Sequence, residues 1–329
     1  MTDITPEMVR AFASDSANWP QFAEILGEVL PKYVAFRWGN AVPYKPFFKA
    51  WQAAGVTIMP NHFYSPVPEL NRLTAEDLDR PLPLDGIEMR DDQQLAFLAQ
   101  LAAFKSEYAQ FLGRPPSSDG LFHFGGAFSR IDAELLYATV RHLKPARFVE
   151  VGTGFSTLAI SEACLKNRDE GHECEFVSID PFPNDILSYD PKGLTRHFAA
   201  RIEEVSPSVL SALQDGDILF IDSTHILKVA SDVEYEFFRI IPRIARGVHI
   251  HLHDIFLPYA YPPCWLEDEH VFWNEQYLLA AFLAFNDAFE VTLAASYLAS
   301  RYPEAMRAAI PGLPDGRLYP GSFWMRRNK

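Results

Sequence analysis

The sequence predicts an α/β protein with a doubly wound, mainly parallel sheet, preceded by a helical extension. After residue 145, short apolar runs alternate with longer amphipathic runs, which is the pattern of strands connected by helices. Before residue 115, apolar residues recur at helical spacing, and prolines and aromatic residues are frequent. We therefore expect an N-terminal helical and aromatic extension over 1–115 and a sheet domain over 116–329.

The extension is expected to contain helices separated by an irregular aromatic stretch. The segments "WPQFAEILGEVL" and "DDQQLAFLAQLAAFKSEYAQFL" carry apolar residues at helical spacing. Between them, Pro60, Pro66 and Pro68 are incompatible with one continuous helix. The turn formers of "GRPPSSDG" at 113–120 are expected to join the extension to the sheet domain.

Four strands of the predicted sheet each end in polar or acidic residues. We read as strands "RFVEV" (147–151), "EFVSID" (175–180), "DILFID" (217–222) and "GVHIHLHD" (247–254). The helices between them are "STLAISEACLKN", "SPSVLSAL" and "ASDVEYEFFRIIPRI". Ligands of such sheets bind outside the carboxyl ends of the strands. A ligand site is therefore expected at Glu150 with "GTGFS", Asp180, Asp222 and the pair His253-Asp254.

A Gly-x-Gly turn follows the first of these strands in "FVEVGTGFST". Gly152 and Gly154 allow the backbone to approach a ligand closely, and Ser156 or Thr157 could cap the following helix. The dinucleotide fingerprint requires a third glycine where Thr157 stands, which disfavours a nicotinamide enzyme. Asp180 is placed to accept hydrogen bonds from a ribose diol, a feature that NAD would share.

These segments together resemble the class I S-adenosylmethionine-dependent methyltransferases. The resemblance covers roughly residues 120–329 and rests on "VEVGTGFST", "VSIDP", "DILFIDSTH" and "GVHIHLHDIFLP", in that order. Within the class, "GFST", "FIDSTH" and "HDIFLP", with "HFYSPVPEL" in the extension, look most like a bacterial branch near small-molecule O-methyltransferases acting on natural products, sugars or phenols.

The resemblance implies a fold and a cofactor. The fold is a Rossmann-like sheet of seven strands with the last one antiparallel, in which "WNEQYLLAAFLAFNDAFEV" is a helix leading into the sixth strand and "GSFWMRR" an antiparallel edge strand. The cofactor is S-adenosylmethionine. Carried over residue by residue, its expected contacts are Glu150, Gly152, Thr153, Gly154, Phe155 and Ser156 on the methionine side, Asp180 on the ribose, Phe182 beside the adenine, and Asp222.

The histidine strand supplies the catalytic candidates. His253, Asp254, Asp222 and His225 are expected to face one another if the strands that carry them are neighbours. A histidine is a suitable general base for an acceptor hydroxyl at neutral pH, and we favour this mechanism, with His253 as the base. A cation such as Mg²⁺ on Asp222 and Asp254 is the alternative, although Ile255 stands where metal-dependent relatives have Asn.

Other polar and aromatic residues near these strands are weaker candidates. His249 lies about 13 Å from His253 at ~3.3 Å per residue, so the three alternating histidines do not form one metal site. We expect His249 and His251 to be hydrogen-bonded histidines packed beneath a helix. Trp273, Glu275 and Gln276 lie where their helix could meet a substrate, but we expect them to be core and surface residues rather than ligands. The proline-rich loop "FLPYAYPPCWLEDEH" and the extension are expected to cover the acceptor, with His62 and Tyr64 as pocket candidates.

The composition of the chain limits the kinds of partner that it can bind. A formal charge of −14 and a pI near 5.1 argue against a broad nucleic-acid surface. No run approaches the roughly 18 apolar residues of a membrane span, so we expect a cytoplasmic protein. The sequence leaves the oligomeric state open, including a homodimer. We predict an enzyme that methylates a hydroxyl of a small molecule. Two alternatives stay open: a nucleoside-binding regulatory protein on the same fold, and an NAD-dependent oxidoreductase.

Overall fold

The computed structural model describes residues 5–34, 45–108, 128–310 and 319–329, and it divides into two compact units. The first unit is Met1–Arg72 and the second is Leu73–Lys329. The expected boundary at 115/116 and the joining segment 113–120 lie outside the described residues. The division after Arg72 nevertheless places residues 73–108 with the sheet, where we had expected them to belong to the extension.

The first unit is helical, as its sequence pattern predicted. Its described elements are α1 (Pro6–Ser14), α2 (Trp19–Tyr33) and α3 (Lys45–Ala53), with short 3₁₀ turns at Ser16–Asn18 and Leu70–Arg72. Helix α1 begins with Thr5 as its cap, whose hydroxyl accepts a hydrogen bond from the amide of Met8 at 3.3 Å. His62 and Tyr64 lie in this unit, where both rings contact Phe63. Their role at an acceptor stays a prediction.

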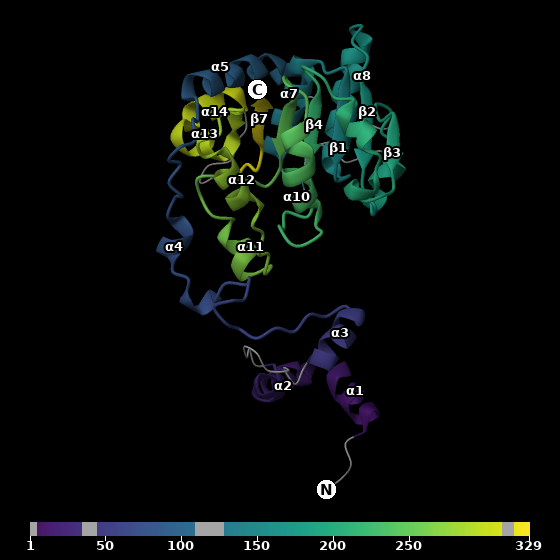
Figure 1. The fold of residues 1–329 in the computed structure, drawn as a ribbon, viewed down its shortest axis with the longest axis vertical. Coiled ribbons are helices and arrows are strands. Elements are labelled where there is room, and N and C mark those ends of the chain that lie inside the picture. The colour runs from purple at the N-terminus through teal and green to yellow at the C-terminus, as the bar shows by residue number, and fades with distance from the viewer. Residues whose placement is uncertain (1–4, 35–44, 109–127, 311–318) are drawn as a thin grey trace. The chain divides into compact units, whose positions relative to one another are not determined.

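The second unit contains a seven-stranded sheet with the strand order β3-β2-β1-β4-β5-β7-β6. The strands are β1 (Arg147–Val151), β2 (Glu175–Ile179), β3 (Arg196–Phe198), β4 (Ile218–Ile221), β5 (His249–Leu252), β6 (Phe289–Ala294) and β7 (Phe323–Arg327). Strands β1 to β5 pair in parallel, and β7 pairs antiparallel with both β5 and β6. Figure 1 shows β3, β2, β1 and β4 following one another, with β7 beyond β4.

The last strand is antiparallel as expected, but its predicted place at the edge of the sheet is wrong. Strand β7 lies between β5 and β6, so β6 forms that edge. Trp324 and Met325 of β7 are fully enclosed at this place. The short strand β3 was also not predicted, since Arg196–Phe198 has no apolar run.

Helices cover both faces of the sheet and create two apolar cores. One core combines Phe148, Phe220 and Trp324 of the strands with apolar residues of helices on that face, which are α5 (Asp91–Leu101), α7 (Arg130–Leu143), α8 (Phe155–Asp169), α13 (Ala295–Arg301) and α14 (Pro303–Ala309). The other combines Val149, Ile221 and Ile250 with α9 (Pro207–Ser211), α10 (Asp232–Tyr235), the following π-helical turn Glu236–Ile240, and α12 (Glu275–Leu283). Alternate strand residues thus face opposite cores, which defines a doubly wound sheet.

The remaining elements of the second unit are short. They are α4 (Ala75–Asp79), α6 (Lys105–Tyr108), α11 (Pro263–Glu267), and 3₁₀ turns at Ala102–Phe104, Asn184–Tyr189, Ile202–Glu204 and Ile241–Arg243. Helix α5 is held to the sheet by Gln94, whose amide oxygen accepts a hydrogen bond from the amide of Ala294 at 2.7 Å. Such long-range bonds explain why residues after 72 belong with the sheet. Among the described residues, no helix has the length and apolarity needed to cross a membrane.

Candidate active site

A cavity of about 340 Å³ opens at the carboxyl ends of β1, β2 and β4. Strand order reverses between β1 and β4, which is the position where open α/β sheets bind ligands. The volume lies within the range typical of small-molecule sites. Its walls are Val151, Gly152, Ile179, Asp180, Pro181, Phe182, Arg201, Ile202, Glu203, Asp222, Ser223, Thr224, Lys228, Ala230, Ser231 and Asp232.

Gly152 brings the ends of β1 and β4 into direct backbone contact. Its φ of +91° lies in the region that favours glycine, and a Cβ at this position would lie 2.0 Å from the carbonyl oxygen of Asp222. The amide of Gly152 donates to the carbonyl of Ile179 at 2.9 Å, which ties the turn to β2 as well. The close approach of the Asp222 carbonyl therefore requires a glycine at this position, whereas the expected reason was the approach of a ligand to the backbone.

Glu150 supports the turn from behind. Its carboxylate is fully buried and accepts hydrogen bonds from the hydroxyls of Ser156 and Thr157, both at 2.7 Å. The Thr157 hydroxyl also accepts a hydrogen bond from the amide of Gly154 at 3.1 Å. Burial raises the pKa of Glu150 to about 8, against the opposing effect of the two hydroxyls. Thr157, at the position of the missing third glycine, thus links the turn to Glu150.

Asp180 clamps the glycine turn to the loop after β2. One carboxylate oxygen accepts from the amide of Thr153 at 2.8 Å and the other from the amide of Phe182 at 2.6 Å. Each oxygen keeps a second lone pair for a ligand donor. The Phe182 side chain is 77% exposed beside the cavity, whereas Phe155 is half-buried at the start of α8.

The structure therefore separates the predicted cofactor residues into two groups. Gly152, Asp180, Phe182 and Asp222 line the cavity, whereas Glu150, Thr153, Gly154, Phe155 and Ser156 lie outside its lining. Sequence reasoning missed Glu203, a cavity residue whose Oε2 is buried and has no hydrogen-bond partner among the described residues. Its only signal was the acidic pair in "RIEEV" after the unpredicted strand β3.

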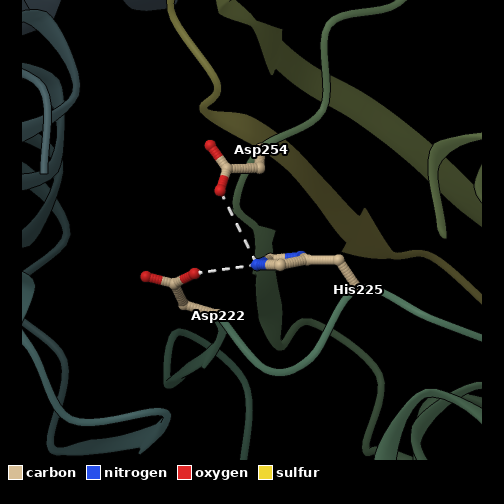
Figure 2. Close-up of side chains that lie close together, drawn as sticks. All are labelled: Asp222, His225 and Asp254. Carbon is tan, nitrogen blue, oxygen red and sulfur yellow. Dashed lines mark ion pairs between the residues drawn. The ribbon is translucent and has the colours of Figure 1, made fainter. Parts of the chain in front are cut away.

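Asp222, His225 and Asp254 form an acid–imidazole cluster next to this cavity. The Nε2 atom of His225 lies 3.2 Å from Oδ1 of Asp222 and 3.6 Å from Oδ2 of Asp254. Figure 2 shows the imidazole pointing between the two carboxylates. The predicted meeting of these residues at adjacent strand ends is confirmed, since β4 and β5 are paired neighbours. Asp222 belongs to both the cluster and the cavity wall.

Three acids hold the loop after β4 in place. The hydroxyl of Ser223 donates to Glu236 at 3.1 Å, and the hydroxyl of Thr224 donates to Asp232 at 2.6 Å. His225 has a φ of +58°, and its Nδ1 lies 2.8 Å from Oε2 of Glu275 on α12. Bonds from three sides thus stabilise a backbone conformation that a histidine rarely adopts.

Glu275 is the second residue that sequence reasoning missed. It is fully buried, which agrees with the core reading, but its direct pairing with His225 was not predicted. An acid at the start of the otherwise apolar helix "EQYLLAAFL" was the available signal. Gln276 is a core residue, as expected, and its side-chain oxygen accepts a hydrogen bond from the amide of Phe256 at 3.0 Å. Trp273 instead lies at the site, where its ring is 4.3 Å from that of His225.

The charges of the cluster are strongly coupled. Burial opposes the charged form of His225, but its hydrogen bonds to Asp222 and Glu275 outweigh that effect and raise its pKa well above the ordinary value. Burial likewise raises the pKa of Asp222, but the imidazoles of His253 and His225 outweigh burial and lower it. For Asp254, burial prevails over the nearby imidazoles and raises the pKa to about 6. Positive charge is therefore favoured between the carboxylates.

His253 borders the cluster at the end of β5. Its Nε2 lies 3.5 Å from Oδ1 of Asp254, and its ring packs on Phe128 at 4.5 Å between centroids. Burial lowers the pKa of His253, but the charges of Asp254 and Asp222 outweigh burial and raise it. The side chains of His253 and His225 are only 7% and 4% exposed, whereas those of Asp222 and Asp254 are 26% and 17% exposed. The carboxylates thus form the accessible part of the site.

The other two histidines of β5 lie outside the acid–imidazole cluster, and the ring of His251 stacks 5.6 Å from that of His253. His251 is fully buried and stacks on Phe220 with 4.2 Å between ring centroids. Within the described ranges neither ring nitrogen has a hydrogen-bond partner, so the expectation of a hydrogen-bonded histidine is wrong for His251. His249 pairs in register with Arg326, and burial together with that guanidinium lowers its pKa to about 4.

Part of the chain is similar in sequence to known proteins. Residues 149–255 match the sequence model of a methyltransferase domain family. A protein described as uncharacterised from Archaeoglobus fulgidus is 26% identical over 140 residues, covering 40% of this chain and 62% of that protein. The chain thus spans less than two thirds of that relative. A solved structure titled "cmcI-D160 Mg-SAM" aligns with a TM-score of 0.32 at 15% identity, covering 59% of this chain and 69% of that one.

The matched segment runs from β1 through the glycine turn, the second and fourth strand ends and the cluster to the residue after Asp254. It therefore contains all of the cavity wall and all of the acid–imidazole cluster. Residues 149–255 thus match a methyltransferase domain, and the seven-stranded sheet with its antiparallel last strand is the fold that the resemblance implied.

Proposed function

We propose that this chain transfers a methyl group from S-adenosylmethionine to a hydroxyl of a small-molecule acceptor. The observation that carries the proposal is the position of Asp222, which lines the nucleoside-sized cavity and at the same time belongs to the acid–imidazole cluster. A proton-accepting cluster at this place is required by an enzyme but not by a protein that merely binds a nucleoside. The acidic balance of the chain favours a small-molecule acceptor over nucleic acid.

The residues of the cavity fit the cofactor. Asp180 keeps free lone pairs for the ribose hydroxyls, and Glu203 presents a buried carboxylate oxygen that lacks a donor. An amino group of the adenine type would supply that donor. Thr153, whose buried hydroxyl also has no partner among the described residues, stands at the glycine turn on the methionine side.

Methyl transfer requires an in-line displacement and a proton acceptor. When bound, the cofactor supplies a methyl group carried on a sulfonium. The bond from the acceptor oxygen to the methyl carbon forms as the bond from sulfur to that carbon breaks, and the electron pair of the broken bond stays on sulfur. The acceptor hydroxyl gives its proton to a base, and we assign the role of this base to the pair His253 and Asp254. The pKa of Asp254, raised to about 6, places this pair near the range in which a base works at neutral pH. His225 and Asp222 position the pair through their charges.

A divalent cation also fits the cluster. Asp222 and Asp254 would hold it, as predicted, and would then leave it accessible to the acceptor because both carboxylates reach the surface. Such a cation lowers the pKa of a hydroxyl bound to it. Figure 2 shows that the imidazole of His225 already lies between the same two carboxylates.

The first test is calorimetric titration of the purified chain with S-adenosylhomocysteine, with NAD as the control. Binding of S-adenosylhomocysteine without binding of NAD is the expected result and justifies a screen of phenolic and sugar acceptors. His253→Ala is then expected to lower turnover at least a hundredfold with unchanged cofactor affinity. Full turnover in this variant would remove His253 from the mechanism, and preference for NAD would overturn the proposal as a whole.

A further inference from the structure

We propose that His225 is a third ligand of a divalent cation at Asp222 and Asp254, and that this nitrogen makes the site selective for a first-row transition metal over Mg²⁺. The inference deepens the proposed methyl transfer, on which the role of the cation rests. It goes beyond the predicted oxygen-only pair because it changes both the ligand set and the class of metal.

The geometry brings three donor atoms to one point. One ligand atom from each of Asp222, His225 and Asp254 lies within 4.8 Å of the other two. The donors come from two adjacent loops at the ends of the paired strands β4 and β5, so the sheet itself fixes their separation. Asp254 presents Oδ2 to this point and Oδ1 to His253, and a cation on Oδ2 therefore leaves the His253 contact intact.

The surroundings of His225 select the nitrogen that can bind. The Nδ1 atom of His225 is paired with the buried carboxylate of Glu275 at 2.8 Å and holds its proton there, so Nε2, which faces Asp222 and Asp254, is the nitrogen that would give up its proton to a bound cation. A carboxylate behind the far nitrogen of a metal-bound histidine is the usual arrangement in metalloproteins, because it fixes the tautomer and makes the imidazole a better donor. Glu275 is thus a positioning residue of the site.

The donor set decides the class of cation. Mg²⁺ prefers oxygen ligands and retains several waters, whereas imidazole nitrogen favours transition metals. Two carboxylates and one imidazole leave coordination positions open on the exposed side of the carboxylates. Mn²⁺ and Co²⁺ suit such a mixed site with open positions, and their affinities for one ligand set rise in that order.

The test measures cation binding without cofactor or acceptor. We would strip the full chain of metal and titrate it with MgCl₂, MnCl₂ and CoCl₂ by calorimetry. The expected result is one cation per chain, with Mn²⁺ and Co²⁺ bound at least tenfold more tightly than Mg²⁺. His225→Gln is expected to lose at least tenfold in Co²⁺ affinity and to change the visible absorption of bound Co²⁺. Glu275→Gln should lower the affinity about tenfold and preserve the nitrogen-ligand spectrum.

His270→Gln is the matched control, because His270 is exposed and lies outside the cluster. It should bind all three cations as the unchanged chain does. Equal affinity for Mg²⁺ and Co²⁺, or a Co²⁺ spectrum that survives His225→Gln, would overturn the nitrogen ligand. Absence of binding by all three cations would overturn the site. If His225→Gln does not fold by circular dichroism, the metal preference of the unchanged chain and the Glu275→Gln titration still decide.

Failure of this inference is distinguishable from failure of the proposed function. Tight Co²⁺ binding by a chain that does not bind S-adenosylhomocysteine would support the metal site and overturn methyl transfer. Binding of S-adenosylhomocysteine by a chain that binds no cation would support methyl transfer and overturn the metal site.

Discussion

The α-carbon of Gly152 faces the main-chain carbonyl of Asp222 so closely that a Cβ would lie 2.0 Å from that oxygen. Gly152→Ala must therefore separate β1 from β4 or distort the turn, in addition to the strain of an alanine at positive φ. We expect a loss of about 3 kcal/mol or more in the free energy of unfolding, together with loss of S-adenosylhomocysteine binding. Urea denaturation and calorimetry measure the two effects.

Gly171→Ala is the control for this substitution. Its φ of +88° is nearly the same, but the space around it is open. Only the conformational cost of about 1 kcal/mol should appear. Similar losses in the two variants would show that the close approach to Asp222 has no energetic weight.

Glu150→Gln should change how stability depends on pH. The folded carboxyl has a pKa of about 8, whereas a free glutamate titrates near 4.5, so the folded state binds the extra proton between these values. Stability from this group is therefore present at low pH and falls as pH rises from about 4.5 to 8, by about 1 kcal/mol per pH unit. The measurement is the free energy of unfolding of the unchanged chain and of Glu150→Gln at pH 5 and at pH 8. If the difference between the two proteins is the same at both pH values, Glu150 is not neutral in the folded state.

Asp180→Ala should weaken cofactor binding more than it weakens the fold. The substitution leaves the amides of Thr153 and Phe182 without their acceptor at the rim of the cavity and removes the predicted ribose contact. We expect S-adenosylhomocysteine to bind about ten- to a hundredfold more weakly, as two charge-assisted hydrogen bonds imply. Asp185→Asn, on the exposed side of the same loop, should bind as the unchanged chain does. Equal effects of both variants would remove Asp180 from the cofactor site.

His251→Phe is expected to stabilise the protein by about 1 kcal/mol. The imidazole is buried on Phe220 and Trp324 with both nitrogens lacking partners among the described residues, so an apolar ring avoids the cost of desolvating them. His249→Phe, nearer the end of the strand, should change stability by no more than about 0.5 kcal/mol. Urea denaturation at pH 7 compares the two, and a destabilised His251→Phe would indicate a bonded imidazole nitrogen.

Local patterns were sufficient for the strands β1, β2, β4 and β5 and for the turn that carries the cavity. The strands ending at Val151, Ile179 and Ile221 are apolar runs with acids or glycine after them, and such patterns depend on neighbours in the sequence. The place of β7 and the existence of β3 depend on pairing with strands far along the chain, which local patterns do not report.

The candidate site was predictable only in part, for the same reason. Asp222, His225 and Asp254 stand at strand ends, so strand adjacency was enough to bring them together. Glu275 reaches His225 across 50 positions of sequence, and Glu203 enters the cavity after a strand of three residues. Both contacts arise from the packing of a helix or a turn against the sheet, and neither residue belongs to a motif.

The insertion of β7 between β5 and β6 affects the order in which this domain can be completed. On the ribosome, β5 and β6 emerge before the strand that joins them, so the nascent domain carries two unpaired sheet edges until residues 323–327 are available. Such edges are templates for pairing with other chains. Chaperone dependence during translation, and aggregation of chains stalled before residue 320, are the consequences expected in the cell.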